Sequence, residues 1–192
     1  MSLALRVAMV LGLWFVSSAA IAQDFARMVS DPLDCVGGGN TYELPEPGGS
    51  FTIVPLYGNA FYVAYSAPEL NSFWVFAFEA PNNQRLQPVT YPNAVRWPFN
   101  NGSPGMEVSH SFFGCGCNEI TGSFQVLDVR YDDQGLPSAL WLTFEQHCEG
   151  APPALRGELR VGFTHTIPAL GTTAMVMLIV LIGGLGLFFA RR

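Results

Sequence analysis

Short runs rich in aromatic and β-branched residues, separated by glycine and proline, fill the middle of this chain. Within several runs apolar and polar residues alternate, which is the period of a half-buried β-strand. Twenty glycines and fourteen prolines punctuate the sequence and mark turns between the runs. The pattern predicts strands at Ser50–Tyr57, Ala60–Ser66, Ser72–Glu79, Val95–Phe99, Met106–Phe112, Thr121–Tyr131, Ala139–Gln146 and Leu155–Phe163.

Two local patterns refine this prediction. The segment Phe73–Phe78 is apolar at every position, and thus on both faces of a strand, so we place it centrally in a sheet. The segment Tyr131–Gly135 contains two aspartates and a glycine, which favours a turn that joins the flanking strands into a hairpin. Short strands at such spacing are typical of an all-β fold. We expect an antiparallel β-sandwich, jelly-roll-like, or a barrel.

Residues 1–22 are typical of a secretory signal peptide. Arg6 is their only charged residue, and Val7–Val16 is continuously apolar. The small residues Ala20 and Ala22 occupy the positions that a signal peptidase reads. A transmembrane helix needs about 20 apolar residues, roughly twice the length of this run. We therefore predict cleavage by signal peptidase after Ala22.

The other end of the chain, residues 167–192, is apolar for longer. No charged residue occurs from Ile167 to Ala190, and Arg191 and Arg192 end the sequence. A helix over 168–190 would measure roughly 34 Å, enough to cross a bilayer core of about 30 Å. The two arginines favour a cytoplasmic C-terminus. The prediction is a single-pass membrane anchor, with the domain at 23–166 exported to the periplasm or cell envelope.

Charge excludes one class of partner. All fifteen acidic residues lie within residues 23–166, together with six arginines and no lysine. Binding to nucleic acid requires a basic surface that neutralises phosphates. We therefore expect no nucleic-acid partner for this domain.

Four cysteines add a covalent constraint: Cys35, Cys115, Cys117 and Cys148. In an exported chain an even number favours disulfides, with three connectivities to choose from. Residues two positions apart in a strand stand about 7 Å apart, so Cys115 and Cys117 should not bond each other. Two pairings remain. In one of them Cys117 and Cys148 face each other at the open end of the predicted hairpin, where a bridge is geometrically easy.

Segments around these cysteines carry a resemblance. They are Gly116–Phe124 (GCNEITGSF), Phe144–Gly150 (FEQHCEG), Pro153–Arg160 (PALRGELR) and, upstream, Ser30–Gly39 (SDPLDCVGGG). Together they resemble a widespread bacterial secreted module of unknown function. In that module the cysteines matching Cys117 and Cys148 are the usual pair, whereas an aromatic residue and an arginine are common where Cys35 and Cys115 stand. The resemblance therefore implies the disulfides Cys117–Cys148 and Cys35–Cys115.

The C-terminal segment resembles a second pattern, the IPTL-type protein-sorting signal of Gram-negative bacteria. That signal combines a short Ile-Pro-x-Leu element, an apolar span with glycines and a basic end. The matching residues here are Ile167, Pro168, Leu170, Arg191 and Arg192. The usual pattern has threonine where Ala169 stands. The resemblance implies a sorting protease that releases the domain or sorts it to the surface, and the plain alternative is a permanent anchor.

Metal sites come into question at two places. Zinc would have four candidate ligands: Cys115, Cys117, His147 and Cys148. Zinc-binding cysteine pairs are usually separated by two to four residues, and an exported thiol is seldom kept reduced, so disulfides are favoured. Calcium would have Asp128, Asp132 and Asp133, which turn chemistry explains at least as well. We expect neither a metal nor another cofactor.

Aromatic residues are the better functional lead. Along Ala139–Glu145, Leu140, Leu142 and Phe144 share one face of the strand and Trp141 lies on the other. If the first face is the core, Trp141 offers a platform for a sugar or a protein. The alternative is that both faces are covered.

No catalytic motif stands out. The sequence contains neither G-x-S-x-G nor H-E-x-x-H, and no two carboxylates are marked out as a glycosidase pair. We therefore expect a non-enzymatic envelope module that binds a glycan or an envelope protein. The alternative is an envelope hydrolase with an acidic cleft, and two convergent carboxylates near Trp74, Trp97 or Trp141 would favour it.

Overall fold

The structure is a computed structural model, and it describes residues 23–54, 56, 58–111 and 115–163. These residues belong to one of the two compact units into which the chain divides, residues 22–164. The predicted signal peptide with Ala20 and Ala22, and the predicted sorting tail at 167–192, lie outside the described residues. Among the residues described, no helix is long and apolar enough to cross a membrane.

Ten β-strands and two short 3₁₀-helices make up the described part of the chain. The strands are β1 (Phe25–Ser30), β2 (Thr41–Leu44), β3 (Ser50–Val54), β4 (Phe61–Ala67), β5 (Ser72–Glu79), β6 (Thr90–Arg96), β7 (Gly105–His110), β8 (Ile120–Tyr131), β9 (Pro137–Cys148) and β10 (Ala154–Val161). The helices are η1 (Pro68–Leu70) and η2 (Pro81–Asn83).

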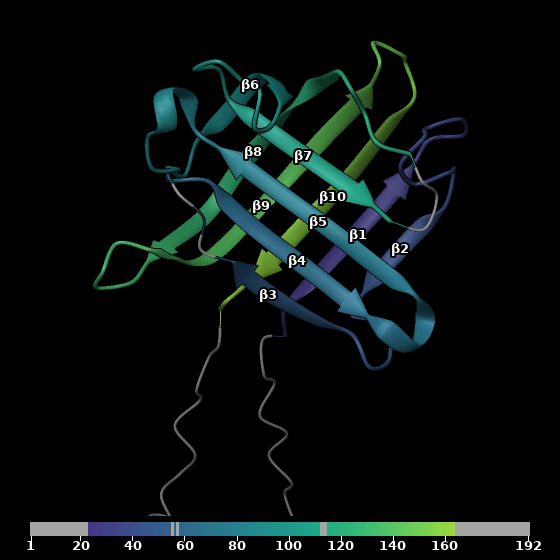
Figure 1. The fold of residues 1–192 in the computed structure, drawn as a ribbon, viewed down its shortest axis with the longest axis horizontal. Coiled ribbons are helices and arrows are strands. Elements are labelled where there is room, and N and C mark those ends of the chain that lie inside the picture. Colours follow the sequence, from purple (N-terminus) through teal and green to yellow (C-terminus); the bar gives the residue numbers. More distant parts are fainter. Residues whose placement is uncertain (1–22, 55, 57, 112–114, 164–192) are drawn as a thin grey trace, which may run out of the picture. The chain divides into compact units, whose positions relative to one another are not determined.

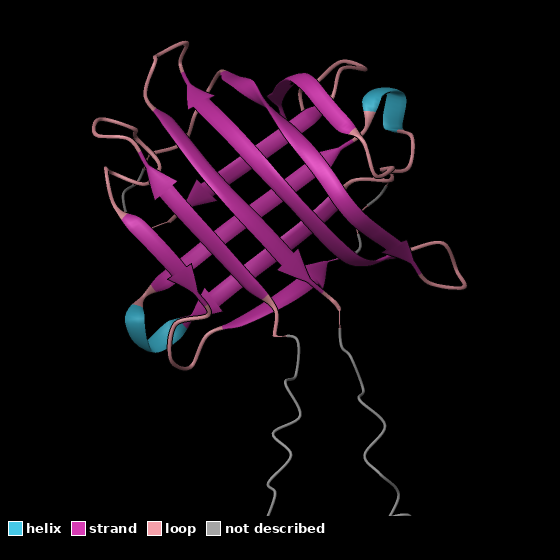
Figure 2. Ribbon diagram, turned by 180° about the vertical axis from the view of Figure 1, so that it is seen from behind, coloured by secondary structure: helices cyan, strands magenta, loops and turns pink. Residues whose placement is uncertain are grey.

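All ten strands join one hydrogen-bonded sheet, in the order β2-β1-β10-β9-β8-β6-β7-β5-β4-β3. The sheet curls over, so that β4, β5 and β7 lie across β8, β9 and β10 (Figures 1 and 2). The all-β prediction is confirmed. The architecture is one curled half-barrel sheet, and it is mixed because β6 and β7 pair in parallel over two residue pairs, where we expected antiparallel strands throughout.

Each predicted strand overlaps an observed one, and Ser72–Glu79 matches β5 at both ends. The prediction missed β1 and β2, which are short and carry charged residues on their outer positions. It also placed β6 too late in the chain. Pro92 and Asn93 lie inside β6 at an irregularity in its pairing with β8, and proline and asparagine are more typical of turns than of strands.

The concave side of the sheet holds the hydrophobic core. Side chains on the core faces of β4, β5 and β9 are fully buried, and along β9 they alternate as predicted. The residues are Phe61, Val63, Trp74, Phe76, Leu140 and Leu142. Burying each such side chain contributes about 1.5–3 kcal/mol before entropy is subtracted. On the outer face of β5, Phe73 remains 40% exposed, so this face of the strand is only partly covered.

The hairpin between β8 and β9 is the longest local element, and it forms where the sequence predicts it. One oxygen of the Asp132 carboxylate accepts the backbone N–H groups of Gln134 and Leu136, at 2.9 and 2.8 Å. Gly135 has φ +81°, which a residue without a side chain adopts at little cost. The hydrogen bonds of the turn therefore account for Asp132 without a bound calcium ion.

Candidate functional site

The four cysteines form two disulfides, Cys35–Cys115 and Cys117–Cys148, with Cα atoms 5.9 and 5.2 Å apart. This is the pairing that the resemblance implies. Because all four cysteines are bonded in pairs, none of them is left as a thiolate ligand for zinc. In the described part of the chain, no group of three or more His, Cys, Asp or Glu side chains is arranged to hold a metal ion.

The glycine-rich segment Ser30–Gly39 forms a tight loop between β1 and β2. The Asp34 carboxylate accepts the Ser30 hydroxyl and the Gly37 N–H, both at 2.8 Å. The Ser30 oxygen in turn accepts the N–H of Gly39 at 2.9 Å. A Cβ added at Gly37 would lie 2.5 Å from the Cβ of Ser30, so only glycine fits there. The segment is thus held by its own hydrogen bonds, and it positions Cys35.

One guanidinium connects three of the segments that carry the resemblance. Nη1 of Arg156 donates to both carboxylate oxygens of Asp31, at 2.9 and 3.0 Å, and Nε donates to Glu145 at 2.7 Å. The other oxygen of Glu145 lies 3.1 Å from Nε2 of His147. Hydrogen bonds from Arg156 hold the pKa of Asp31 and the pKa of Glu145 below their ordinary values.

Other residues of these segments also have structural roles. The Glu149 carboxylate accepts the N–H groups of Asn118 and Glu119, which fixes the chain next to Cys117. Gly157 lies under the Phe144 ring, where an added Cβ would come within 2.7 Å of that ring. The residues around the cysteines thus hold this corner of the sheet together.

Trp141 lies on the outer face of β9, as the alternation predicts, and is half-buried. Its indole N–H donates to the Glu158 carboxylate at 2.7 Å, and the guanidinium carbon of Arg160 lies 5.8 Å from the ring centroid. The polar edge of the indole is therefore already occupied within the domain. A ligand at this face would have to compete with Glu158 for that edge.

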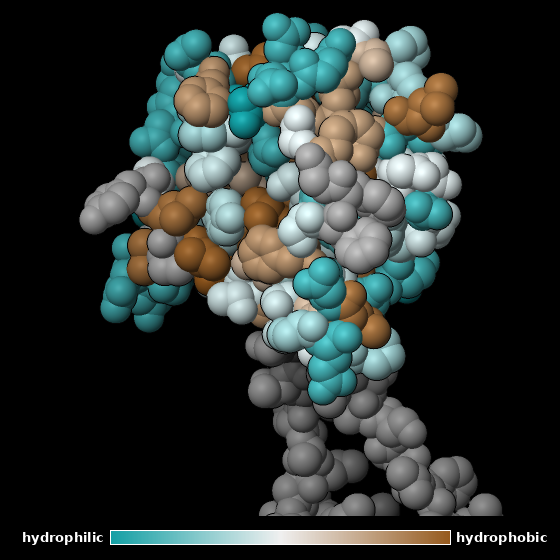
Figure 3. Space-filling view, turned by 45° about the vertical axis from the view of Figure 1, so that its right-hand side comes forward, coloured by the Kyte–Doolittle hydropathy of each residue, from teal (hydrophilic) through white to brown (hydrophobic). Residues whose placement is uncertain are grey.

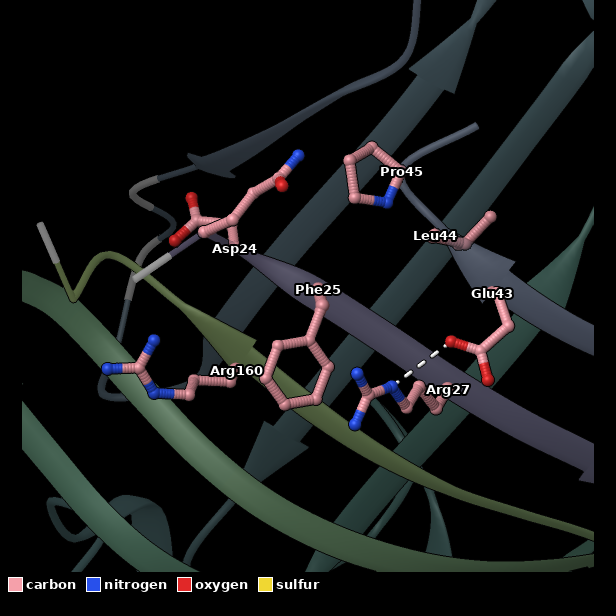
Figure 4. Close-up of a pocket in the computed structure, with 8 residues that line it drawn as sticks. Asp24, Phe25, Arg27, Glu43, Leu44, Pro45 and Arg160 are labelled. Carbon is pink, nitrogen blue, oxygen red and sulfur yellow. Dashed lines mark hydrogen bonds and ion pairs between the residues drawn. The ribbon is translucent and has the colours of Figure 1, made fainter. Parts of the chain in front are cut away.

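A hollow of about 470 Å³ lies at the start of β1, beside β2 and β10. The Phe25 ring stands between the guanidinium groups of Arg27 and Arg160 (Figure 4). Arg27 is paired with Glu43 at 3.0 Å, and the carboxylate of Asp24 accepts the N–H of Gly162 at 2.9 Å. Two guanidinium groups and two carboxylates thus share this hollow, and its formal charges cancel.

A larger hollow, of about 660 Å³, lies where β5 ends and β7 begins. Three connecting segments contribute to it: the residues before β4, the helix η2, and the turn between β6 and β7. The lining residues are Gly58, Ala60, Glu79, Asn82, Asn83, Trp97, Pro98, Asn100, Asn101 and Gly102. One indole, four amides and one carboxylate therefore converge on a single space, which we call the Trp97 hollow.

The protein backbone holds the Trp97 hollow in shape. The N–H of Asn82 donates to the carbonyl of Gly102 at 3.1 Å, which joins η2 to the turn. The N–H of Asn59 donates to the side-chain oxygen of Asn83 at 2.8 Å. A Cβ added at Gly105 would lie 3.2 Å from Cδ1 of Trp97, so glycine at the start of β7 lets the indole lie close over the strand.

Several polar groups of the Trp97 hollow remain available to a ligand. Within the described residues, the side chains of Glu79, Asn82 and Asn101 have no hydrogen-bond or ion-pair partner. Asn82 and Asn101 are exposed, and Glu79 and Trp97 are half-buried. The Trp97 ring is supported by Tyr62, with ring centroids 5.8 Å apart. The hollow thus offers both hydrogen-bond donors and acceptors beside an aromatic face.

A second carboxylate, Glu107, lies near the Trp97 hollow but does not line it. Glu79 pairs with Gly105 and Ala77 with Glu107, so the two glutamates are diagonal neighbours on adjacent strands. One oxygen of Glu107 is buried 3.7 Å from Nε of Arg96, and its side chain is 14% exposed. Burial raises the pKa of Glu107 above its ordinary value.

Among the residues that the structure describes, large exposed apolar side chains do not define a competing site. They are Val29, Leu33, Leu70, Phe73, Val89, Phe99, Leu127 and Leu136, and they come from many different elements. On the face shown in Figure 3, apolar side chains form small groups among hydrophilic ones. Scattered apolar residues of this kind are normal for a protein surface.

The chain matches no protein-family model, no curated protein and no solved structure. Function must therefore be argued from the site itself. The sequence indicated Trp97 only as one of three tryptophans beside which a hydrolase cleft could lie. It did not indicate the asparagine side chains that line the hollow. Their signal was present as two Asn-Asn pairs, at Asn82-Asn83 and Asn100-Asn101, beside proline or glycine in predicted turns.

Proposed function

We propose that this chain is an exported, membrane-anchored or sorted envelope protein, and that its non-enzymatic β domain binds a glycan in the Trp97 hollow. Its two disulfides fit an oxidising compartment outside the cytoplasm. The signal-like and anchor-like ends of the sequence support the same location. The observation that carries the binding proposal is the joint lining of one hollow by Trp97, four asparagines and Glu79.

The chemistry of this lining suits a sugar. A pyranose ring has an apolar C–H face, which packs on an indole, and a rim of hydroxyl groups that both donate and accept hydrogen bonds. Asparagine amides also donate and accept, and a carboxylate accepts strongly from hydroxyl groups. The volume lies within the range of roughly 300–1,000 Å³ typical of small-ligand sites.

The hydrolase alternative draws support from the diagonal placement of Glu79 and Glu107. A glycosidase needs a protonated carboxyl and a second carboxylate on opposite sides of the same bond. The raised pKa of Glu107 suits the acid. Its buried oxygen beside Arg96, and its position outside the lining of the hollow, favour binding without hydrolysis.

Glycan binding by the purified full-length protein tests the proposal. We expect a glycan array to give ligands that titration calorimetry then confirms, without release of reducing ends. Trp97→Ala should weaken binding at least about tenfold, since it removes the aromatic wall, which corresponds to about 1.4 kcal/mol. Trp141→Ala is the matched control and should bind as the wild type does. Loss of binding in the Trp141 variant alone would move the site to the outer face of β9.

The proposed location has its own test. Mass spectrometry of the protein from cell envelopes should show Gln23 as the first residue, because we expect signal peptidase to cleave after Ala22. If a sorting protease acts, the tail should be lost near Ile167 and Pro168. A mature protein that retains Arg192 would instead identify residues 167–192 as a permanent anchor.

A further inference from the structure

Resting on the glycan-binding function proposed above, we infer that the Trp97 hollow selects uncharged glycans over acidic ones, and that Glu79 makes this selection. Glu79 then has a role in specificity that is separate from the aromatic contact made by Trp97.

The charge inventory of the hollow carries the argument. Of the ten described residues that line it, Glu79 alone is ionisable, and no described arginine or histidine lines the space. Arg96 directly precedes Trp97 in the chain. Its Nε atom lies 3.7 Å from Oε2 of Glu107, and its Cζ atom lies 5.1 Å from the centroid of the Phe99 ring. Its charge is thereby directed to Glu107 and Phe99, neither of which lines the hollow.

An acidic sugar would meet an uncompensated like charge in this space. A carboxylate, sulfate or phosphate group bound near the Glu79 carboxylate is repelled, and the half-buried position of Glu79 reduces screening by water. A like charge at hydrogen-bond range commonly shifts an equilibrium about tenfold or more. A neutral hydroxyl group in the same position would instead donate a charge-assisted hydrogen bond to Glu79.

A second hollow of the domain, at the start of β1, shows that the absence of described cations beside Trp97 is a local feature. At the start of β1, two guanidinium groups, those of Arg27 and Arg160, line a space of about 470 Å³ (Figure 4). Guanidinium groups are fork-shaped donors that suit oxyanions, although here Glu43 already pairs with Arg27. The Trp97 hollow offers amides in their place, which bind neutral polar groups without charge.

Matched pairs of probes test the inference on the full-length protein. Each pair consists of a neutral hexasaccharide, of glucan, mannan or galactan, and the same chain oxidised to the uronate at C6. The quantity compared is the Trp97-dependent affinity, obtained from wild-type protein and Trp97→Ala. For a neutral chain that binds, we expect the oxidised counterpart to bind at least about tenfold more weakly at low salt.

Two further measurements isolate Glu79. Glu79→Gln keeps the size of the side chain and removes its charge. The ratio of the affinity for the neutral chain to the affinity for its oxidised counterpart should therefore fall toward one. Glu158→Gln, beside Trp141, is the control and should leave the preference unchanged. In wild-type protein, raising the salt concentration should narrow the preference by screening, and this measurement keeps the test valid if the Glu79 variant does not fold.

The outcomes separate the two proposals. If no probe of either kind binds in a Trp97-dependent manner, the glycan-binding function is overturned and the inference falls with it. If an oxidised chain binds through Trp97 as tightly as its neutral counterpart, the inference is overturned while the binding function stands. The inference is also overturned if the preference persists unchanged in folded Glu79→Gln.

Discussion

Gln146 is fully buried on the core face of β9, and both polar atoms of its side-chain amide are satisfied by one residue. Its oxygen accepts the N–H of Val108, and its nitrogen donates to the carbonyl of Val108, each at 2.8 Å. β7 needs these bonds because β6 pairs with it only as far as Met106. The side chain therefore takes the place of a neighbouring strand in bonding Val108, and it joins β9 to β7, which lies across it.

Replacing this amide should be costly. In Gln146→Leu, both backbone groups of Val108 lose their partner in a water-free environment, and each unsatisfied group costs about 1–3 kcal/mol. We expect the free energy of unfolding to fall by about 2–4 kcal/mol, measured by urea denaturation. Gln125→Leu, on the exposed side of β8, is the control and should change stability by less than about 0.5 kcal/mol. Equal stability of the two variants would contradict this role of Gln146.

Residue-level features differ in how far sequence predicts them. Alternation along β9 places Trp141 outside and Leu142 inside, because the period of a strand is a property of neighbouring residues. The role of Gln146 was not predictable, since its partner Val108 lies 38 positions earlier. The Trp97 hollow was missed for the same reason: its amides come from segments that only the folded sheet brings together.

At the scale of elements, Arg156, Asp31 and Glu145 form a cluster, the Arg156 cluster, that fastens the loop after β1 to β9 and β10. Asp31 also accepts the N–H of Ala154 at 3.0 Å, so its carboxylate bonds both the backbone and the side chain of β10. Glu145 completes the contact on β9. All these groups are partly exposed, so the cluster determines where the loop lies more than it adds stability.

This cluster gives the domain an acid-sensitive corner. Hydrogen bonds to Arg156 lower the pKa of Asp31 and of Glu145 below their ordinary values of 3.8 and 4.5. A depressed pKa means that the folded state prefers the ionised group, so the stabilisation is complete above the ordinary pKa and is lost as pH falls through the lowered one. Stability should therefore decline as pH drops below about 5.

Arg156→Gln should flatten that decline, because it removes the group that depresses both pKa values. Urea midpoints at neutral and acidic pH, compared for wild type and variant, measure the effect. Arg27→Gln breaks the exposed pair with Glu43 and serves as the control, with the wild-type pH dependence retained. An Arg156 variant whose midpoint falls with pH as steeply as that of the wild type would refute the assignment.

At the scale of the whole described domain, two disulfides constrain the chain on both sides of Gly116. Cys117–Cys148 closes 31 residues and Cys35–Cys115 closes 80. On the chain-entropy estimate these closures contribute about 3–4 and about 4.5 kcal/mol. Many domains are stable by only about 5–15 kcal/mol, so either bond is a large share of the total.

We expect replacement of Cys117 and Cys148 by alanine to lower the free energy of unfolding by about 3–4 kcal/mol, or to prevent accumulation of the folded protein. Replacing Cys35 and Cys115 should cost at least as much. The two effects should not add, because Cys115 and Cys117 anchor the same short segment. Denaturation curves, with non-reducing peptide mapping to confirm the remaining bond, measure this. A cost below about 1 kcal/mol for either pair would contradict the estimate.

The fold class was predictable at this scale, whereas the architecture was not. Turn residues and alternation in short runs predict strands, and they carry no information on which distant strands become neighbours. The curled half-barrel depends on pairings such as β1 with β10 and β5 with β7, which join segments far apart in the sequence. The short charged strands β1 and β2 lacked any local signal strong enough to include them.

The position of β1 between β2 and β10 has a consequence for how the molecule matures. A ribosome delivers the N-terminal strand first, yet the strand that completes its pairing is the last one, ending at Val161. The hairpin of β8 and β9 can form early, because its strands are neighbours in sequence. Until β10 arrives, β1 presents an open edge that other chains can pair with. Closing this sheet therefore depends on a contact between residues more than a hundred positions apart, a feature that slows folding in general.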